Sequence, residues 1–183
     1  VQNEGDKMIY FTSDLHINHK NILCYERESR PFNTVEEMNQ AIIDNINEVV
    51  QQDDTLLILG DILMGPKDKA EGWLEQINCR NVMVILGNHD SNKWKQEYYR
   101  SLGWSIANYT VVERNCFRFF CYHYPIEETG QQLYTKQDIY LYGHVHGNGP
   151  KRLQSDNTYH VGLDTNNLYP VSIEQIIKEY YER

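Results

Sequence analysis

The sequence predicts an α/β fold of mixed type, in which two packed β-sheets carry helices on their outer faces. Three observations lead to this prediction. Short apolar runs alternate with helical stretches in the first half of the chain, which is the pattern of β-α-β units. The second half is richer in strand-like runs and closes with a helix. No internal repeat and no linker rich in Pro, Gly or Ser divides the sequence, so residues 8–183 are expected to form a single domain.

The first elements are a strand and a capped helix. Residues 8–13 are mostly β-branched or aromatic, which favours a strand. Residues 34–50 place apolar side chains at helical spacing. Thr34 followed by Glu37 three positions later predicts a capping box at the start of this helix.

Two short apolar runs then predict strands that are buried on both faces, as in a parallel sheet. They cover residues 55–59 (TLLIL) and 82–86 (VMVIL). The stretch between them, residues 67–77, is expected to be helical. Strand, helix and strand follow one another here in the order of a β-α-β unit.

The second half predicts a helix at 92–102, four strands and a final helix. The first two strands are expected at 105–113 and 116–122, joined by a hairpin at Arg114-Asn115. The remaining elements are strands at 138–142 and 158–162 and a helix at 172–181.

Composition and charge limit the classes of function. Hydrophobic residues make up 40% of the 183 residues and charged residues 23%, which is a globular balance. The 17 Lys and Arg face 26 Asp and Glu, and the formal net charge of −9 disfavours binding of extended duplex nucleic acid. No apolar run reaches the roughly 20 residues that span a bilayer, so we expect a cytoplasmic protein that does not bind membranes. Residues 1–7 are expected to be disordered or to be an extension foreign to the domain.

The four cysteines predict no disulfide framework. Cys24, Cys79, Cys116 and Cys121 form no CxxC pair, and their spacing does not fit a small disulfide scaffold. We expect them to be reduced.

Polar side chains follow five of the predicted strands, at the point where each strand ends. Since ligand sites in α/β sheets lie at the carboxyl ends of strands, these loops are expected to converge on one crevice. Carboxylate, amide and imidazole groups together are the ligands of divalent metals, and Asp61 is the natural bridge between two ions. The residues concerned are Asp14, His16, Asp61, Asn88, His89, Asp90, His123, His144 and His146.

These residues form five blocks in a fixed order along the chain: Asp14-Leu15-His16, Gly60-Asp61, Gly87-Asn88-His89-Asp90, His123 and Gly143-His144-Val145-His146. In this order the sequence resembles the calcineurin-like metallophosphoesterases, and in particular their small, cap-free prokaryotic and phage branch. The resemblance implies a four-layer αββα sandwich of two mixed sheets flanked by helices, with a dinuclear metal site at the strand carboxyl ends.

The resemblance also implies roles for individual residues. Asp14, His16, Asp61 and His146 would hold one divalent ion, and Asp61, Asn88, His123 and His144 would hold the other. A hydroxide between the ions would attack phosphorus in line, and Asp61 would be catalytic as the bridging ligand. His89 would be catalytic as a donor to a phosphoryl oxygen or to the leaving group.

Further contacts are expected around this centre. A protonated His89 needs a carboxylate partner, for which Asp90 and Asp164 are both candidates. Asn88, His19, Arg30 and Lys93 are candidate contacts to a substrate phosphate. The expected cofactors are two divalent ions, manganese first, with iron, zinc, nickel or cobalt as alternatives.

The expected reaction is hydrolysis of a small phosphodiester or phosphomonoester. Residues 62–65 follow Asp61 without the arginine that related protein phosphatases carry there, which argues against a protein substrate. Two other functions stay open: a catalytically silent scaffold for protein interaction, and a nuclease acting on short single strands. A homo-oligomer is also compatible with the sequence.

Overall fold

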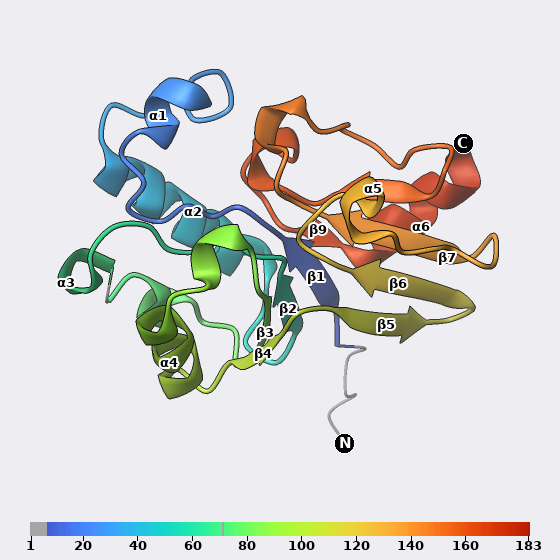
Figure 1. Cartoon of the computed structure of the whole chain (residues 1–183), viewed down its shortest axis with the longest axis horizontal. Coiled ribbons are helices and arrows are strands. Elements are labelled where there is room, and N and C mark those ends of the chain that lie inside the picture. The colour runs from blue at the N-terminus through green and yellow to red at the C-terminus, as the bar shows by residue number, and fades with distance from the viewer. Residues whose placement is uncertain (1–6, 71) are drawn as a thin grey trace.

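The computed structural model describes residues 7–70 and 72–183. Its first sheet has five strands in the order β4-β3-β2-β1-β9 (Figure 1). Neighbours among β1 to β4 are parallel, while β9 runs antiparallel to β1. The strands are β1 Ile9–Thr12, β2 Thr55–Ile58, β3 Asn81–Ile85, β4 Ser105–Ala107 and β9 Val171–Ser172.

The second sheet has four strands in the order β5-β6-β7-β8. β5 and β6 form an antiparallel hairpin, whereas β6, β7 and β8 are parallel to one another. The strands are β5 Thr110–Arg114, β6 Phe117–Cys121, β7 Asp138–Tyr142 and β8 Thr158–His160. Both sheets are therefore mixed, as the sequence analysis predicts.

Two longer helices cover the outer face of the first sheet. Ile42 of α2 and Tyr99 of α4 belong to one apolar cluster with Leu56 and Val84 of the sheet. The helices are α1 Ile22–Tyr25, α2 Val35–Val49, α3 Lys67–Ala70, α4 Lys93–Ser101, α5 Ile126–Thr129 and α6 Ile173–Glu182. Single turns of 3₁₀-helix lie at Leu74–Gln76, Asn88–Asp90, His146–Asn148 and Leu163–Thr165.

The core between the sheets is aromatic and aliphatic. Phe11 of β1 stacks against Phe119 of β6 with ring centroids 6.1 Å apart. α6 adds Ile176 to this core, and its Tyr180 packs edge-on against Phe117. On the outer face of the second sheet, α5 lies over a smaller cluster that includes Tyr140. The predicted layers of helix, sheet, sheet and helix are confirmed, although the covering helix on the second sheet is a single turn.

Most predicted elements are present, and the capping box is formed. Thr34 Oγ1 accepts a hydrogen bond from the Glu37 backbone at 3.2 Å, and the Glu37 carboxylate accepts one from the Thr34 backbone at 3.3 Å. Among the described residues no helix is both long enough and apolar enough to cross a bilayer.

Two predicted elements differ in the structure. The helix expected at 67–77 is divided into α3 and a 3₁₀ turn, and Gly72, with φ near +91°, interrupts it. The strand expected at 105–113 is two strands in different sheets, because the chain leaves the first sheet after β4 and enters the second at β5. The short elements α1, α5 and β9 have no clear sequence pattern of their own.

The strand ends that carry the predicted site residues meet at one edge of the molecule. Asp14, Asp61 and Asn88 follow the parallel strands β1, β2 and β3. The backbone N–H of His144, after β7, donates to Asp14 Oδ2 at 2.9 Å and so joins the second sheet to this edge. Apart from Lys7, the predicted extension 1–7 lies outside the described residues, and the single domain over 8–183 stays a prediction.

Candidate metal centre

Six of the predicted ligands form two groups whose ligand atoms lie close together. The first group is Asp14, His16 and His146, and the second is Asp61, His123 and His144. Within each group the candidate ligand atoms all lie within 4.8 Å of one another. The two groups combine residues from four strand ends, so folding brings together side chains that are far apart in the sequence.

Asp61 lies between the two groups. Its Oδ2 is 3.8 Å from His16 Nε2 in the first group and 3.6 Å from His123 Nε2 in the second. Its Oδ1 accepts a hydrogen bond from the backbone N–H of His89 at 2.9 Å. One carboxylate oxygen thus faces both groups while the other is held by the protein.

Asn88 adds an oxygen to the second group. Its side-chain oxygen lies 3.0 Å from His123 Nε2 and 3.1 Å from His144 Nδ1. An amide oxygen placed between two imidazole nitrogens completes a donor set of oxygen and nitrogen atoms that suits a borderline divalent ion.

The first group contains buried polar atoms without partners. Asp14 Oδ1 and His16 Nε2 are buried and have no hydrogen-bond partner within the described part of the chain. Leaving such atoms unpaired costs roughly 1–3 kcal/mol each. A cation between them would satisfy both, so the residues present fit a bound metal.

Five of the seven candidate ligands have a positive φ, a conformation that non-glycine residues adopt infrequently. Strained backbone of this kind persists where the surrounding structure fixes it, and it gathers at functional sites. The five residues are Asp14, His16, Asp61, His144 and His146, with φ between 50° and 71°.

The glycines of the motif are needed because side chains approach them closely. A Cβ on Gly60 would lie 2.6 Å from His123 Nδ1, and the φ of Gly60 is +90°. A Cβ on Gly143 would overlap the Asp14 carboxylate and the Ser13 hydroxyl. The motif glycines therefore leave room for the candidate ligands themselves.

Three of the histidines are oriented by a hydrogen-bond partner on the ring nitrogen that faces away from the group. His123 Nδ1 lies 2.7 Å from the carbonyl oxygen of Leu59, and His146 Nδ1 lies 2.9 Å from Asp164 Oδ2. His16 Nδ1 lies 3.2 Å from His19 Nδ1. The Leu59 carbonyl and the Asp164 carboxylate accept from the Nδ1–H of His123 and His146, which leaves the Nε2 of these two rings to bind a metal.

Arg30 and Asp164 form a buried ion pair behind the first group. Arg30 is completely buried, and its guanidinium donates to Asp164 Oδ1 at 2.7 Å and to Oδ2 at 3.0 Å. It also donates to the carbonyl oxygens of Asp14 and Leu15. The sequence analysis expects Arg30 to contact a substrate phosphate, but the structure buries it and directs its donors to Asp164 and to the loop after β1.

The same contacts shift the pKa values of the buried groups. Burial alone would raise the pKa of Asp164, but hydrogen bonds from His146 and Arg30 outweigh it and hold that pKa well below its usual range. Burial, reinforced by the charge of Arg30, places the pKa of His16 well below its ordinary value. Burial raises the pKa of Asp61, against the opposing effects of His123 and the His89 backbone N–H. A neutral His16 is the form that binds a metal.

Asp90 connects the loops that carry Asp61 and Asn88. Its Oδ2 accepts from the backbone N–H groups of Asp61 and Gly87 at 2.6 and 3.1 Å. Its Oδ1 accepts from the hydroxyl of Tyr99 at 2.8 Å. Both carboxylates proposed as partners of His89 have other partners: Asp90 accepts from the backbone N–H groups of Asp61 and Gly87, and Asp164 contacts the ring of His146.

Lys95 is a structural partner of the site that the sequence analysis does not identify. It is buried, and its ammonium group donates to the carbonyl oxygens of Leu63 and, at 2.7 Å, of His89. Lys95 lies on the same face of α4 as Tyr98 and Tyr99, both buried. A lysine at an apolar helical position is the signal that could have identified it.

The remaining candidates lie at the opening of the site or beyond it. His89 Nε2 is 3.9 Å from Asp61 Oδ2, and 43% of the His89 side chain is exposed. His19 is half-buried beside His16. Lys93 extends into solvent, where its amino group lies 3.5 Å from Glu97 on the same helix.

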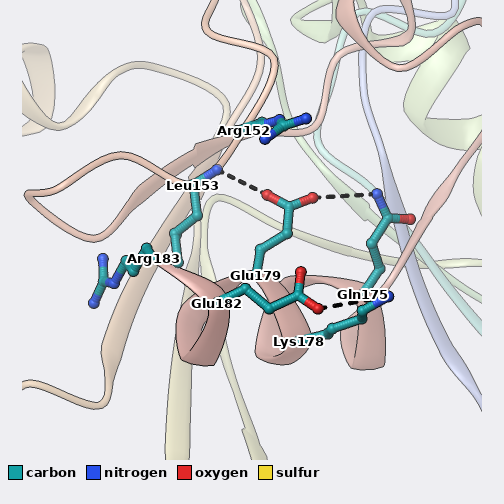
Figure 2. Close-up of a pocket in the computed structure, with 7 residues that line it drawn as sticks. All are labelled: Arg152, Leu153, Gln175, Lys178, Glu179, Glu182 and Arg183. Carbon is teal, nitrogen blue, oxygen red and sulfur yellow. Dashed lines mark hydrogen bonds and ion pairs between the residues drawn. The ribbon is translucent and has the colours of Figure 1, made fainter.

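A separate pocket of about 400 Å³ lies along α6 (Figure 2). Glu179 of α6 accepts from the backbone N–H of Leu153 at 3.0 Å, and this bond connects α6 to the loop before β8. Glu179 also accepts from Gln175 on the same helix at 3.4 Å. None of the seven lining residues is a candidate ligand, and Glu179 has a structural role. We assign no function to this pocket.

Comparison with known sequences identifies relatives of this chain. The sequence model of the calcineurin-like phosphoesterases matches residues 7–145. The protein named "Uncharacterized protein MJ1445" from Methanocaldococcus jannaschii is 33% identical over 94% of this chain and 90% of its own length. The Gene 66 protein of Mycobacterium phage D29 is 26% identical over 95% of this chain and 98% of its own length.

Solved structures share the fold. The protein of unknown function AQ665 from Aquifex aeolicus superposes with a TM-score of 0.73, at 24% identity, over 94% of this chain and 99% of its own. The phosphoesterase Yfce from E. coli gives a TM-score of 0.52 at 22% identity, covering 85% of this chain and 78% of its own. These likenesses show the fold alone.

Proposed function

The chain belongs to the calcineurin-like phosphoesterase family, and from this premise we propose that it is a metal-dependent hydrolase of small phosphoesters. The observation that carries the proposal is the pair of candidate ligand groups that share Oδ2 of Asp61. Asp14, His16 and His146 would hold one ion with Asp61. Asn88, His123 and His144 would hold the other with the same carboxylate.

Two divalent ions, when bound, would supply Lewis acidity at the phosphoryl oxygens and lower the pKa of a coordinated water. The ligand set of carboxylate, amide and imidazole is compatible with manganese, which we propose as the working ion. The unpaired Asp14 Oδ1 and His16 Nε2 support the first ion in particular.

His89 is the proposed proton donor to the substrate. Its ring is partly exposed, with Nε2 3.9 Å from Asp61 Oδ2, so it could donate to a phosphoester bound at the ligand groups. Donation there would stabilise charge on a phosphoryl oxygen or protonate the leaving alkoxide. Lys95 and Asp90 position this residue through its backbone and that of the adjacent loop.

The scaffold and nuclease alternatives receive less support. A catalytically silent scaffold does not require the strained backbone found at five candidate ligands. It also does not require a partly exposed imidazole at position 89. A nuclease would have to attract nucleic acid against the net charge of −9. The four cysteines are free, which supports the cytoplasm as the proposed location.

The test is hydrolysis of bis-p-nitrophenyl phosphate before chelation, after chelation and after return of manganese or nickel. We expect turnover that is lost with the metal and recovers with it, while Asp61→Ala stays inactive. Absence of turnover with every divalent metal between about pH 6 and 9 would overturn the proposal.

A further inference from the structure

We propose that Tyr124 is a positioning residue of the second ligand group, and that its ring holds His144 in the orientation that binds the second ion. The inference rests on the proposed function and deepens it, because it concerns the ion that His144 would hold together with Asp61. Tyr124 directly follows His123 at the end of β6, and its side chain is half-buried.

His144 differs from the other three candidate ligand histidines in what surrounds its ring. Nδ1 of His16, of His123 and of His146 each lies within hydrogen-bond distance of a partner outside the two groups. Nδ1 of His144 instead lies 3.1 Å from the side-chain oxygen of Asn88, which is itself a candidate ligand. Its Nε2 has no hydrogen-bond partner in the part of the chain that the structure describes. No hydrogen bond from outside the second group therefore fixes this ring.

The ring of Tyr124 contacts both imidazoles of the second group. Its centroid lies 5.0 Å from that of His144 and 4.9 Å from that of His123, with interplanar angles of 62° and 78°. The two imidazoles are 5.1 Å apart at an angle of 72°. Edge-to-face contacts with centroids about 4.5–7 Å apart are the favoured arrangement of such rings. The three rings thus form one packed cluster, and turning His144 away from Asn88 would also change its contact with Tyr124.

The second sheet holds the backbone of Tyr124 in place. Tyr140 of β7 is fully buried, and its hydroxyl donates to the carbonyl oxygen of Tyr124 at 2.8 Å. The same hydroxyl lies 2.9 Å from Oγ1 of Thr129 in α5, and the ring of Tyr140 stacks on Tyr122 with centroids 5.2 Å apart. Pro125 follows Tyr124 and restricts its backbone. The position of the Tyr124 ring is therefore set by the sheet and does not depend on a bound ion.

The role assigned to Tyr124 belongs to its ring and not to its hydroxyl. Within residues 7–70 and 72–183 the hydroxyl has no hydrogen-bond partner. Tyr124→Phe keeps the ring and its contacts with His123 and His144, whereas Tyr124→Leu removes them. Loss of a partner that orients a metal-bound histidine typically weakens metal binding by about 10- to 100-fold. We expect the lower end of this range, because the ring packs against His144 without a hydrogen bond.

The test is a manganese titration in which electron paramagnetic resonance measures the free ion, so that both dissociation constants are obtained without a substrate. We expect Tyr124→Leu to raise the dissociation constant of the second ion about ten-fold and to leave that of the first unchanged. Tyr124→Phe should keep both wild-type values. Tyr109→Leu is the matched control, because Tyr109 makes a ring contact of similar length, 5.2 Å, with Tyr122 and not with a ligand. It should leave both constants unchanged.

The outcomes separate the inference from the proposed function. Wild-type affinity for both ions in Tyr124→Leu, or an equal loss in Tyr124→Phe, would overturn the inference and leave the proposed function in place. So would an equal loss of both ions in Tyr124→Leu, since that is the result of a general folding defect. A wild-type protein that binds fewer than two manganese ions would overturn the proposed two-ion centre and the inference with it.

Discussion

The two candidate ligand groups differ in how far their polar atoms are already hydrogen-bonded. In the second group, the Asn88 oxygen lies between His123 and His144 within hydrogen-bond distance of both. In the first group, Asp14 Oδ1 and His16 Nε2 are buried and have no partner among the described residues. Since the Leu59 carbonyl fixes the N–H of His123 at Nδ1, the Asn88 oxygen can accept a hydrogen bond from His144 Nδ1 but not from His123 Nε2. We therefore expect an ion to stabilise both groups, and the first more strongly, because it holds two buried polar atoms without a partner among the described residues.

The supports behind the two groups differ as well. The second group is oriented by the Leu59 carbonyl on His123 and by the buried Asp90 carboxylate, which accepts from the backbone N–H of Asp61. The first is oriented by a buried ion pair, in which Arg30 and Asp164 fix the β1 loop and His146. Each group therefore depends on one buried carboxylate behind it, Asp164 for the first and Asp90 for the second.

The largest expected effect comes from removing the residue that the groups share. Asp61→Asn keeps the size of the side chain but weakens the oxygen that faces both groups, so we expect turnover to fall by about 10³-fold or more. Steady-state hydrolysis of bis-p-nitrophenyl phosphate checks this. Circular dichroism provides the control for folding, and a variant of near wild-type activity would show that Asp61 is not shared.

The next largest effect is expected at His89, which belongs to neither group. His89→Asn removes the proposed proton donor and should lower kcat by about 10²-fold. Elemental analysis should find the metal content of wild-type protein, because the ligand atoms of both groups are intact. Metal loss equal to that of His144→Ala would make His89 a ligand instead.

Asp138 is a buried carboxylate outside the site, and unlike Asp14 it has hydrogen-bond partners for both oxygens. Asp138 is fully buried and accepts hydrogen bonds from Arg118, Thr135 and the backbone of Tyr134. Burial alone would raise the pKa of Asp138, but these bonds outweigh it and lower the pKa. A carboxylate with a lowered pKa in the folded state stabilises the protein above its unfolded pKa, near 3.9, and loses that contribution as pH falls through the folded value.

Asp138→Asn should therefore lower the free energy of unfolding by about 1–3 kcal/mol at pH 7. The difference from wild type should shrink as the pH falls below about 4. Urea unfolding across this pH range measures both quantities. A difference that does not depend on pH would contradict the assigned ionisation, and activity at pH 7 serves as the unchanged control.

The smallest expected effect is at Asp14, where we expect a substitution to raise the stability of the metal-free protein. In the metal-free protein Asp14→Asn removes a buried carboxylate oxygen without a partner, so we expect the free energy of unfolding to rise by about 1 kcal/mol. Added manganese should then stabilise the variant less than wild type. Thermal unfolding with and without metal checks this, and a metal-free variant less stable than wild type would show that Asp14 is satisfied without an ion.

Much of the site could be predicted because strand ends are readable from sequence. Apolar runs place Asp14, Asp61 and Asn88 after parallel strands, and parallel strands end at one edge of a sheet. The role of Arg30 could not be predicted, because its partner Asp164 lies 134 residues further along the chain. The positive φ values could not be predicted either, since tertiary contacts impose them on residues that do not favour them.

Local features of the fold could be predicted from the sequence, whereas the pairing of strands could not. The capping box of α2 is local, and it is found as predicted. The division of residues 105–113 between β4 and β5 depends on which sheet each half pairs with, and the sequence does not encode that pairing locally. β9 has two residues, too few to show any periodicity.

The proposed sharing of Asp61 Oδ2 by two ions can be measured by electron paramagnetic resonance of the manganese-loaded protein. With two equivalents of manganese per chain, we predict the spectrum of an exchange-coupled pair, and we predict that Asp61→Asn loses the coupling. A spectrum of isolated manganese ions in the wild-type protein at the same loading would contradict the account.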